Sequence, residues 1–272
     1  MLTALIAAVL GLIVGSFLNV CIYRLPRDLS VARPARSFCP ECEKTIAWYD
    51  NIPVLSYFLL RRRCRHCSAA IPLRYPLVEA LTAAAFFGAG YLFGATARGA
   101  RLALFSALLI GLIFTDMEER ILPDEMTLGG ALAGLIFAAF VPMRPGLVSI
   151  LLFRHGPRFQ SLAESAVGAL FGSLIMWLFG ELYKRLRGRE GLGLGDVKML
   201  AMIGAFVGLE ASLMTIMLGS ILGAIAGIAF IRATGRDMSS YELPFGSFLG
   251  FAALVVAFLG EPALRWYTHT GT

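Results

Sequence analysis

Two aspartates lie where an apolar chain rarely places a charge. Asp116 follows the apolar stretch 102–114, and Asp196 ends the glycine-rich run 191–196, just before another apolar stretch. A carboxylate at the end of a membrane helix is costly and usually serves a function. Two carboxylates brought together cannot easily both ionise, so one proton is shared. The pair suggests acid–base chemistry in which one aspartate takes a proton from water and the other protonates a scissile carbonyl.

A structural interpretation of the same acids stays open. An aspartate beside a glycine turn is often only a helix cap, which is the alternative for Asp196. Capping is favoured for Asp124, because it follows Pro123 and precedes the next apolar stretch. Glu79 could reach the surface or line a pocket. The sequence contains neither Gly-x-Ser-x-Gly nor His-Glu-x-x-His, so carboxylates are the main hydrolytic groups available.

Four cysteines form a second constellation. Cys39 and Cys42 make one C-x2-C knuckle, Cys64 and Cys67 make another, and 21 residues separate the two. This spacing is close to that of structural zinc ribbons, in which four thiolates fill a tetrahedral coordination sphere. We therefore expect a structural ion, most simply zinc. Disulfides or free thiols are the alternative, and disulfides are rare in the cytoplasm.

The composition is that of a polytopic membrane protein. Of 272 residues, 58% are apolar and 15% are charged, and the mean hydropathy is +0.74. Soluble domains have about 45–50% apolar and about 25% charged residues. We expect an all-α fold with about eight membrane-spanning helices. The apolar runs cover residues 1–23, 76–95, 101–115, 125–142, 162–183, 197–209, 211–231 and 244–262.

The distribution of charge predicts the topology. The chain carries a net charge of +6, and its basic residues gather between Arg24 and Arg74 and again at 184–189. The positive-inside rule places both segments in the cytoplasm and the N-terminus outside, which puts both aspartates on the cytoplasmic side. Topology and attraction to anionic membrane lipid explain the basic segments, so no nucleic-acid partner is expected.

Three domains follow from this pattern. Residues 1–23 form a first helix, which we expect to be retained because no basic residue precedes it and no small-x-small cleavage site follows. Residues 24–75 form a compact, proline-rich cytoplasmic module that carries the cysteines. Residues 76–272 form the remaining transmembrane domain with both aspartates.

Several motifs together resemble those of one family. They are the run Gly15-Ser-Phe-Leu-Asn-Val-Cys-Ile-Tyr-Arg-Leu-Pro26, the two cysteine knuckles, Asp116 with Leu122-Pro123-Asp124, Gly193-Leu-Gly-Asp-Val-Lys198, and Pro244-Phe-Gly246. In this combination the chain resembles the bacterial type IV prepilin peptidases, also called leader peptidase and N-methyltransferase. The resemblance covers nearly the whole chain.

The resemblance implies a membrane aspartic peptidase of the Gly-x-Gly-Asp type in the bacterial inner membrane. Such an enzyme removes the basic leader of type IV prepilins and pseudopilins after a glycine, and its active site faces the cytoplasm. The family's catalytic pair corresponds to Asp116 and Asp196, and Asp124 to a second, less essential acid. Members with the cysteine module also methylate the new first residue, using S-adenosylmethionine. No glycine-rich nucleotide motif is visible, so the methyl-donor site is not identified.

The charge pattern suggests how a prepilin would bind. Its scissile bond joins a basic leader to an apolar helix and would lie at the inner membrane surface. We expect Glu118 and Glu119 to attract the leader, and Lys198 or Arg120 to pair with an acidic residue of the mature pilin.

Other functions remain open. One is a peptidase without methyl transfer, or a related intramembrane protease. Another is a zinc-stabilised scaffold or transporter in which the acids bind ions. Transporters often show internal repeats and broken helices near the membrane midplane. Here no repeat is evident and both acids lie at helix ends on one side, which favours the enzyme.

Overall fold

The computed structural model describes residues 1–188, 193–234 and 244–270, the last ten by their backbone only. Within these residues the chain is helical, and its only strand-like pairings are two isolated bridges. The all-α expectation is therefore confirmed. The chain divides into two compact units, Met1–Gly111 and Leu112–Thr272. The three-domain division stays a prediction.

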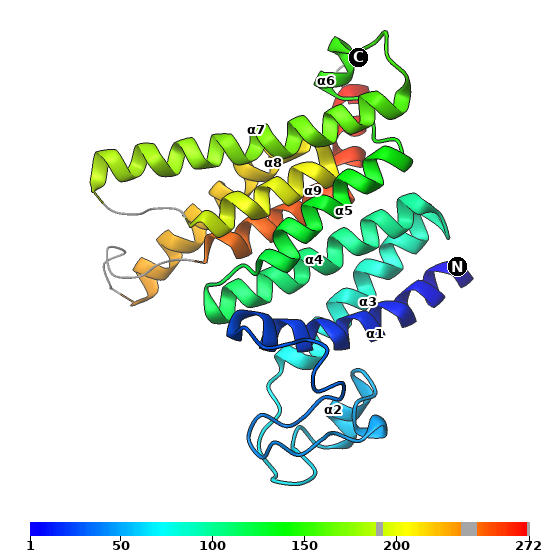
Figure 1. The fold of residues 1–272 in the computed structure, drawn as a ribbon, viewed down its shortest axis with the longest axis vertical. Coiled ribbons are helices and arrows are strands. Elements are labelled where there is room, and N and C mark those ends of the chain that lie inside the picture. The colour runs from blue at the N-terminus through cyan, green and yellow to red at the C-terminus, as the bar shows by residue number, and fades with distance from the viewer. Residues whose placement is uncertain (189–192, 235–243, 271–272) are drawn as a thin grey trace. The chain divides into compact units, whose positions relative to one another are not determined.

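The first unit contains two long helices and the cysteine module between them. Helix α1 spans Leu2–Arg24 and α3 spans Arg74–Phe93, and they lie side by side (Figure 1). Small residues of α1 make this close approach possible, because a Cβ on Gly15 would lie 2.6 Å from the backbone of Glu79. The module contains only the short helices η1 (Leu25–Arg27), η2 (Trp48–Asp50) and α2 (Leu55–Leu59).

The second unit is a bundle of long helices. Helix α4 (Ala97–Glu119) crosses the boundary between the units and contributes its last two turns. The bundle then continues with α5 (Asp124–Phe140), α7 (Pro157–Arg187), α8 (Leu194–Thr234) and α9 (Phe245–Thr270). Helix α8 packs against α5, α7 and α9, so the long central helix connects the others.

Helix α8 is bent at Gly208, where φ is 82° and ψ is −176°. A glycine adopts this backbone conformation at no steric cost. The bend falls at the expected break between the apolar runs 197–209 and 211–231. Beside it, a Cβ on Gly168 of α7 would come within 2.6–2.9 Å of Gly204 and Gly208. The glycines therefore let the two helix backbones touch.

The segment before α7 is tied to that helix by a buried acid. It contains the short helix α6 (Leu147–Leu151). Glu164 of α7 accepts hydrogen bonds from the backbone N–H groups of Gly146, at 2.9 Å, and Ser149, at 3.0 Å. One carboxylate thus satisfies N–H groups at the start of α6, which would otherwise lack partners.

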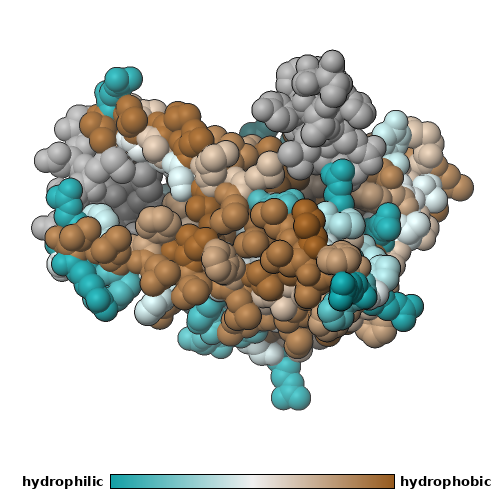
Figure 2. All heavy atoms as spheres, turned by 90° about the horizontal axis from the view of Figure 1, so that it is seen from above, coloured by the Kyte–Doolittle hydropathy of each residue, from teal (hydrophilic) through white to brown (hydrophobic). Residues whose placement is uncertain are grey.

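The helices expose much apolar surface, as expected for a protein in a membrane. Large apolar side chains are exposed along α1, α5, α7 and α8, and hydrophobic residues cover much of the face drawn in Figure 2. Five helices of the described residues are long and apolar enough to cross a membrane: α1, α3, α4, α7 and α8. The number of about eight spans stays a prediction.

The α7–α8 contact makes a prediction for stability. Gly168→Ala should destabilise the protein by about 1–3 kcal/mol, because the new methyl group meets backbone atoms that cannot move aside as a side chain could. Thermal unfolding in detergent would measure this. Gly129→Ala in α5 is the matched control, because nothing lies within 4 Å of its new methyl group. Equal melting temperatures for the two variants would contradict the tight contact.

Candidate active site and metal centre

Both candidate catalytic aspartates lie in the second unit. Asp116 is in the last turn of α4, and Asp196 is the third residue of α8. Their exposed fractions are 6% and 8%. Helix α4 continues to Glu119, so Glu118 and Glu119, the expected contacts for the leader, belong to its last turn. The two acids are 80 residues apart in sequence and are brought together by the bundle.

A glycine of α9 lies between the two carboxyl groups. A Cβ placed on Gly246 would be 3.1 Å from Oδ2 of Asp116 and 3.1 Å from Oδ1 of Asp196. These two oxygens are therefore separated by at most twice that distance. Any larger residue at this position would crowd both acids. The motif Pro244-Phe-Gly246 thus contributes the space in which the carboxyl groups meet.

Ser247 holds one of the acids. Its backbone N–H and its hydroxyl both donate to Oδ2 of Asp116, at 2.6 Å and 2.7 Å. Because Oδ2 is engaged twice, the second oxygen of Asp116 is the one left for water or substrate. The sequence analysis did not identify Ser247. Its position directly after Gly246, in the motif at the start of α9, was the available signal.

The glycine turn before α8 positions the other acid. The backbone N–H of Asp196 donates to the carbonyl of Gly193 at 3.1 Å. A Cβ on Gly195 would lie 3.1 Å from the side chain of Leu122, in the loop between α4 and α5. The absence of a side chain at 195 therefore lets the start of α8 pack against that loop. Gly191 and Leu192, which begin the run, lie outside the described residues.

The expectation for Asp124 is wrong in its detail. The N-cap of α5 is Pro123, and Asp124 is the first helical residue without a capping hydrogen bond. Its two oxygens instead accept from Lys198 of α8 at 2.7 Å and 2.9 Å. The Asp124 carboxylate binds Lys198 of the neighbouring helix and does not cap its own helix. The pair ties the start of α5 to the start of α8, two residues after Asp196.

The four cysteines of the first unit meet as the sequence predicted. The sulfur atoms of Cys39, Cys42, Cys64 and Cys67 all lie within 4.8 Å of one another. Cys39 Sγ and Cys67 Sγ are 3.8 Å apart, much farther than the bonded distance of about 2.05 Å in a disulfide. A tetrahedral zinc ion with Zn–S bonds of about 2.3 Å would set its ligands about 3.8 Å apart. The donor set therefore fits such an ion.

The two knuckles are built on the same turn. The N–H of Glu43 donates to the carbonyl of Cys39, and the N–H of Ser68 donates to the carbonyl of Cys64. Both donors have left-handed backbone angles, with φ of 56° and 61°. An isolated bridge closes each turn, Phe38 to Thr45 and Arg63 to Ala70. The repeat explains how two separate segments aim their thiols at one point.

Local hydrogen bonds prepare one thiol for metal binding. The backbone N–H groups of Cys67 and His66 point at the Cys64 sulfur and lower the pKa of its thiol, while the neighbouring thiols raise the pKa of Cys67. The thiolate is the form that binds a metal. His66 contributes through its backbone, and its side chain is not part of the cluster.

An ion pair joins the second knuckle to η2. Arg65 donates from Nε and Nη2 to the two oxygens of Asp50, each at 2.6 Å. These hydrogen bonds lower the pKa of Asp50. Because the pKa is lower in the folded module, the pair stabilises it at neutral pH, and the effect is lost as the pH falls below the ordinary range of an aspartate.

Two buried charges attach the module to its helices. Glu79 of α3 accepts from the backbone N–H of Val54 at 2.6 Å, where Val54 has a φ of 62°. Arg24, at the end of α1, donates to the carbonyls of Ser30, Val31 and Pro34. Glu79 is thus neither at the surface nor a free pocket acid. The role of Arg24 was missed, because an arginine that binds carbonyls leaves no sequence pattern.

Comparisons with known proteins agree with these sites. Residues 9–93 match the bacterial peptidase A24 N-terminal domain, and residues 103–228 match the type IV leader peptidase family. A prepilin leader peptidase/N-methyltransferase of Burkholderia pseudomallei strain 1026b is 37% identical over 94% of this chain and 85% of that protein. The chain belongs to the type IV leader peptidase family.

Further relatives extend over the same length. Proteins with the same name from Aeromonas hydrophila and Pseudomonas aeruginosa are each 35% identical. The matches cover 94% and 95% of this chain and 91% of each relative. No solved structure matches this chain. In this leader peptidase, the N-terminal match contains the cysteine cluster and the second match contains both aspartates.

The cysteine geometry predicts one metal ion per chain. Cys64→Ser should lower the zinc content from about one ion per chain to a small fraction of that, because the tetrahedral site loses a thiolate. Elemental analysis of the purified protein would measure it. Cys21→Ser is the matched control, because Cys21 is buried in α1 and lies outside the cluster. Unchanged zinc in the Cys64 variant would contradict the site.

Proposed function

We propose that this leader peptidase is a membrane aspartic endopeptidase that removes the basic leader of type IV prepilins and pseudopilins. Its catalytic residues would be Asp116 and Asp196. The observation that carries the proposal is the meeting of two buried carboxyl groups on either side of Gly246. Family membership supports the reaction class.

The reaction needs one carboxylate and one carboxylic acid. The carboxylate takes a proton from water, whose oxygen attacks the carbonyl carbon of the scissile bond, while the acid gives its proton to the carbonyl oxygen. The tetrahedral intermediate then collapses, the C–N bond breaks, and a proton passes to the departing amine. Ser247 fixes one oxygen of Asp116, so that the other can meet the water in a constant orientation.

The site would face the cytoplasm of the inner membrane. This orientation rests on the positive-inside rule, since the basic module follows α1 and further basic residues end α7. The scissile bond of a prepilin, between a basic leader and an apolar helix, would then lie at the membrane surface beside the ends of α4 and α8. Membrane lipid is the other expected partner, and no nucleic-acid partner is expected.

The module would hold a structural zinc ion. Four thiolates would fill its coordination sphere and leave no open position for a substrate. A module of this size with few helices gains much of its stability from such an ion. The ion would therefore stabilise the fold of the module and take no part in hydrolysis.

A second activity would be N-methylation of the new first residue. The relatives' names include N-methyltransferase over the length of the match. S-adenosylmethionine would supply the methyl group. Labelled S-adenosylmethionine that fails to bind the purified protein would count against this activity and leave the peptidase proposal untouched.

The charged residues near the pair bear on how a pilin binds. Lys198 already pairs with Asp124, so an acidic residue of the pilin would have to compete with it. Glu118 and Glu119, in the last turn of α4, remain the proposed contacts for a basic leader.

Replacing either aspartate should stop leader removal. The full-length protein in lipid would be incubated with a prepilin, and the mass of the pilin would be measured. Asp116→Ala and Asp196→Ala should each abolish cleavage, because either the general acid or the general base is lost. Asp124→Asn is the comparison variant and should retain much of the activity, because Asp124 links α5 to α8 and is neither the general acid nor the general base. Cleavage by a folded, zinc-loaded Asp116 or Asp196 variant would overturn the assignment.

Ser247 should affect turnover more than binding. Ser247→Ala removes one hydrogen bond to Asp116 and should lower kcat by about 10- to 100-fold, since a hydrogen bond to a charged group is worth about 1.5–3 kcal/mol. KM should change little, because the hydroxyl is directed to Asp116. Ser247→Thr keeps the hydroxyl and should restore most of the rate. Ser173→Ala, which loses only a bond within α7, is the control.

Equal losses in the alanine and threonine variants of Ser247 would mean that the size of the side chain matters and the hydrogen bond does not.

A further inference from the structure

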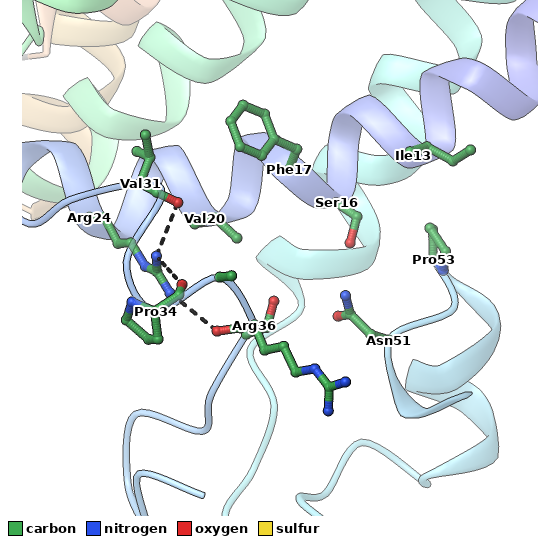
Figure 3. A pocket seen from close by; sticks show the side chains of 12 residues that line it. Ile13, Ser16, Phe17, Val20, Arg24, Val31, Pro34, Arg36, Asn51 and Pro53 are labelled. Carbon is green, nitrogen blue, oxygen red and sulfur yellow. Dashed lines mark hydrogen bonds between the residues drawn. The ribbon is translucent and has the colours of Figure 1, made fainter. Parts of the chain in front are cut away.

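A cavity of about 330 Å³ lies in the first unit, where α1 meets the cysteine module. Ile13, Ser16, Phe17 and Val20 of α1 line one side. Figure 3 shows that Arg36 and Asn51 belong to the module on the opposite side. The remaining lining residues are Arg24, Val31, Pro34, Ala35, Ser37 and Pro53. Neither Asp116 nor Asp196 is among the lining residues.

The floor of the cavity is fixed by Arg24. Arg24 is 3% exposed, and its guanidinium donates to the carbonyls of Val31 and Pro34, at 3.1 Å and 2.9 Å. Figure 3 shows these bonds. The carbonyl oxygens, which would repel an anion, are therefore occupied. The positive charge of Arg24 is balanced by no carboxylate in the lining.

Arg36 supplies a second, available charge. Its side chain is exposed, and within the described part of the chain it has no ion-pair partner. Asn51 is a further polar lining residue of the module (Figure 3). Of the twelve lining residues, none is acidic. The lining is therefore suited to a negatively charged group.

An apolar surface begins directly at the edge of this basic cavity. Ile13 and Phe17 are 58% and 53% exposed, and the exposed face of α1 continues through Val9, Ile6 and Leu2. Since α1 is long and apolar enough to cross a membrane, this face would meet acyl chains. A ligand that fits both parts has an anionic head and long apolar chains.

We infer that the cavity binds the phosphate head of an anionic phospholipid, with the acyl chains lying along the exposed face of α1. A free phosphate carries the same anionic group as the lipid head. Only the lipid has acyl chains that would also contact Ile13 and Phe17. Glu79 of α3 hydrogen-bonds to the lining residue Ser16, so S-adenosylmethionine, with its sulfonium and ammonium groups, is the competing ligand in the test.

The test measures lipid binding directly. The full-length protein in a non-ionic detergent would be titrated with phosphatidylglycerol or phosphatidylcholine of the same chain length, and bound lipid counted by native mass spectrometry. We expect phosphatidylglycerol to bind more tightly. Arg36→Gln should weaken that preference about fivefold, which corresponds to about 1 kcal/mol for one basic residue at a membrane surface. Phe17→Ala should weaken both lipids.

Arg33→Gln is the matched control. Arg33 is exposed in the same segment and is not part of the lining, so its loss should leave the preference unchanged. Unchanged zinc content would verify that the Arg36 variant is folded.

Three results would overturn the inference. Equal weakening by Arg33→Gln and Arg36→Gln would mean diffuse attraction to a basic surface. Competition by inorganic phosphate as effective as that by phosphatidylglycerol would mean a site for a free anion. Binding of labelled S-adenosylmethionine that is lost in Arg36→Gln and Phe17→Ala would mean a methyl-donor site. None of these results bears on the aspartate pair, because lipid binding is measured without a prepilin.

Discussion

The second unit depends on keeping two carboxyl groups together where water is scarce. Their mutual repulsion and their burial both oppose the arrangement. Three helix ends counter this cost. The last turn of α4 supplies Asp116, the first turn of α8 supplies Asp196, and the first turn of α9 supplies Gly246 and two hydrogen bonds. The rest of the bundle can be understood as the framework that brings these ends to one place.

Small residues make that framework compact. Gly168, Gly204 and Gly208 let α7 and α8 touch, and Gly195 lets the start of α8 reach the loop before α5. In a membrane, apolar contact between helices gains little over contact with lipid, so close backbone packing carries more of the association. The Asp124–Lys198 pair adds a polar link between α5 and α8 at the end that bears the acids. The close packing of the helices therefore determines where the two acids lie.

Much of this arrangement could be predicted from the sequence. The apolar runs predicted the long helices. Glu210 marked a break between two runs, and the structure has a bend in α8 at Gly208. The cysteine spacing predicted the cluster, because four thiols at knuckle spacing have few other uses. Such signals are local or periodic. Ser247, Arg24 and the partner of Asp124 were missed, since each bond depends on a residue or carbonyl whose position only the folded chain defines. Asp124 and Lys198, for example, are 74 residues apart.

The repeated turn of the cysteine module has a consequence for insertion of the chain into the membrane. Reduced thiols are maintained in the cytoplasm, whereas the opposite side of a bacterial inner membrane is oxidising. A chain inserted upside down would expose the same four sulfur atoms to oxidants, and Cys39 and Cys67 already lie 3.8 Å apart. A covalent cross-link would then compete with the metal and distort both turns. In the proposed cytoplasmic orientation the four thiols would stay reduced and able to bind the metal.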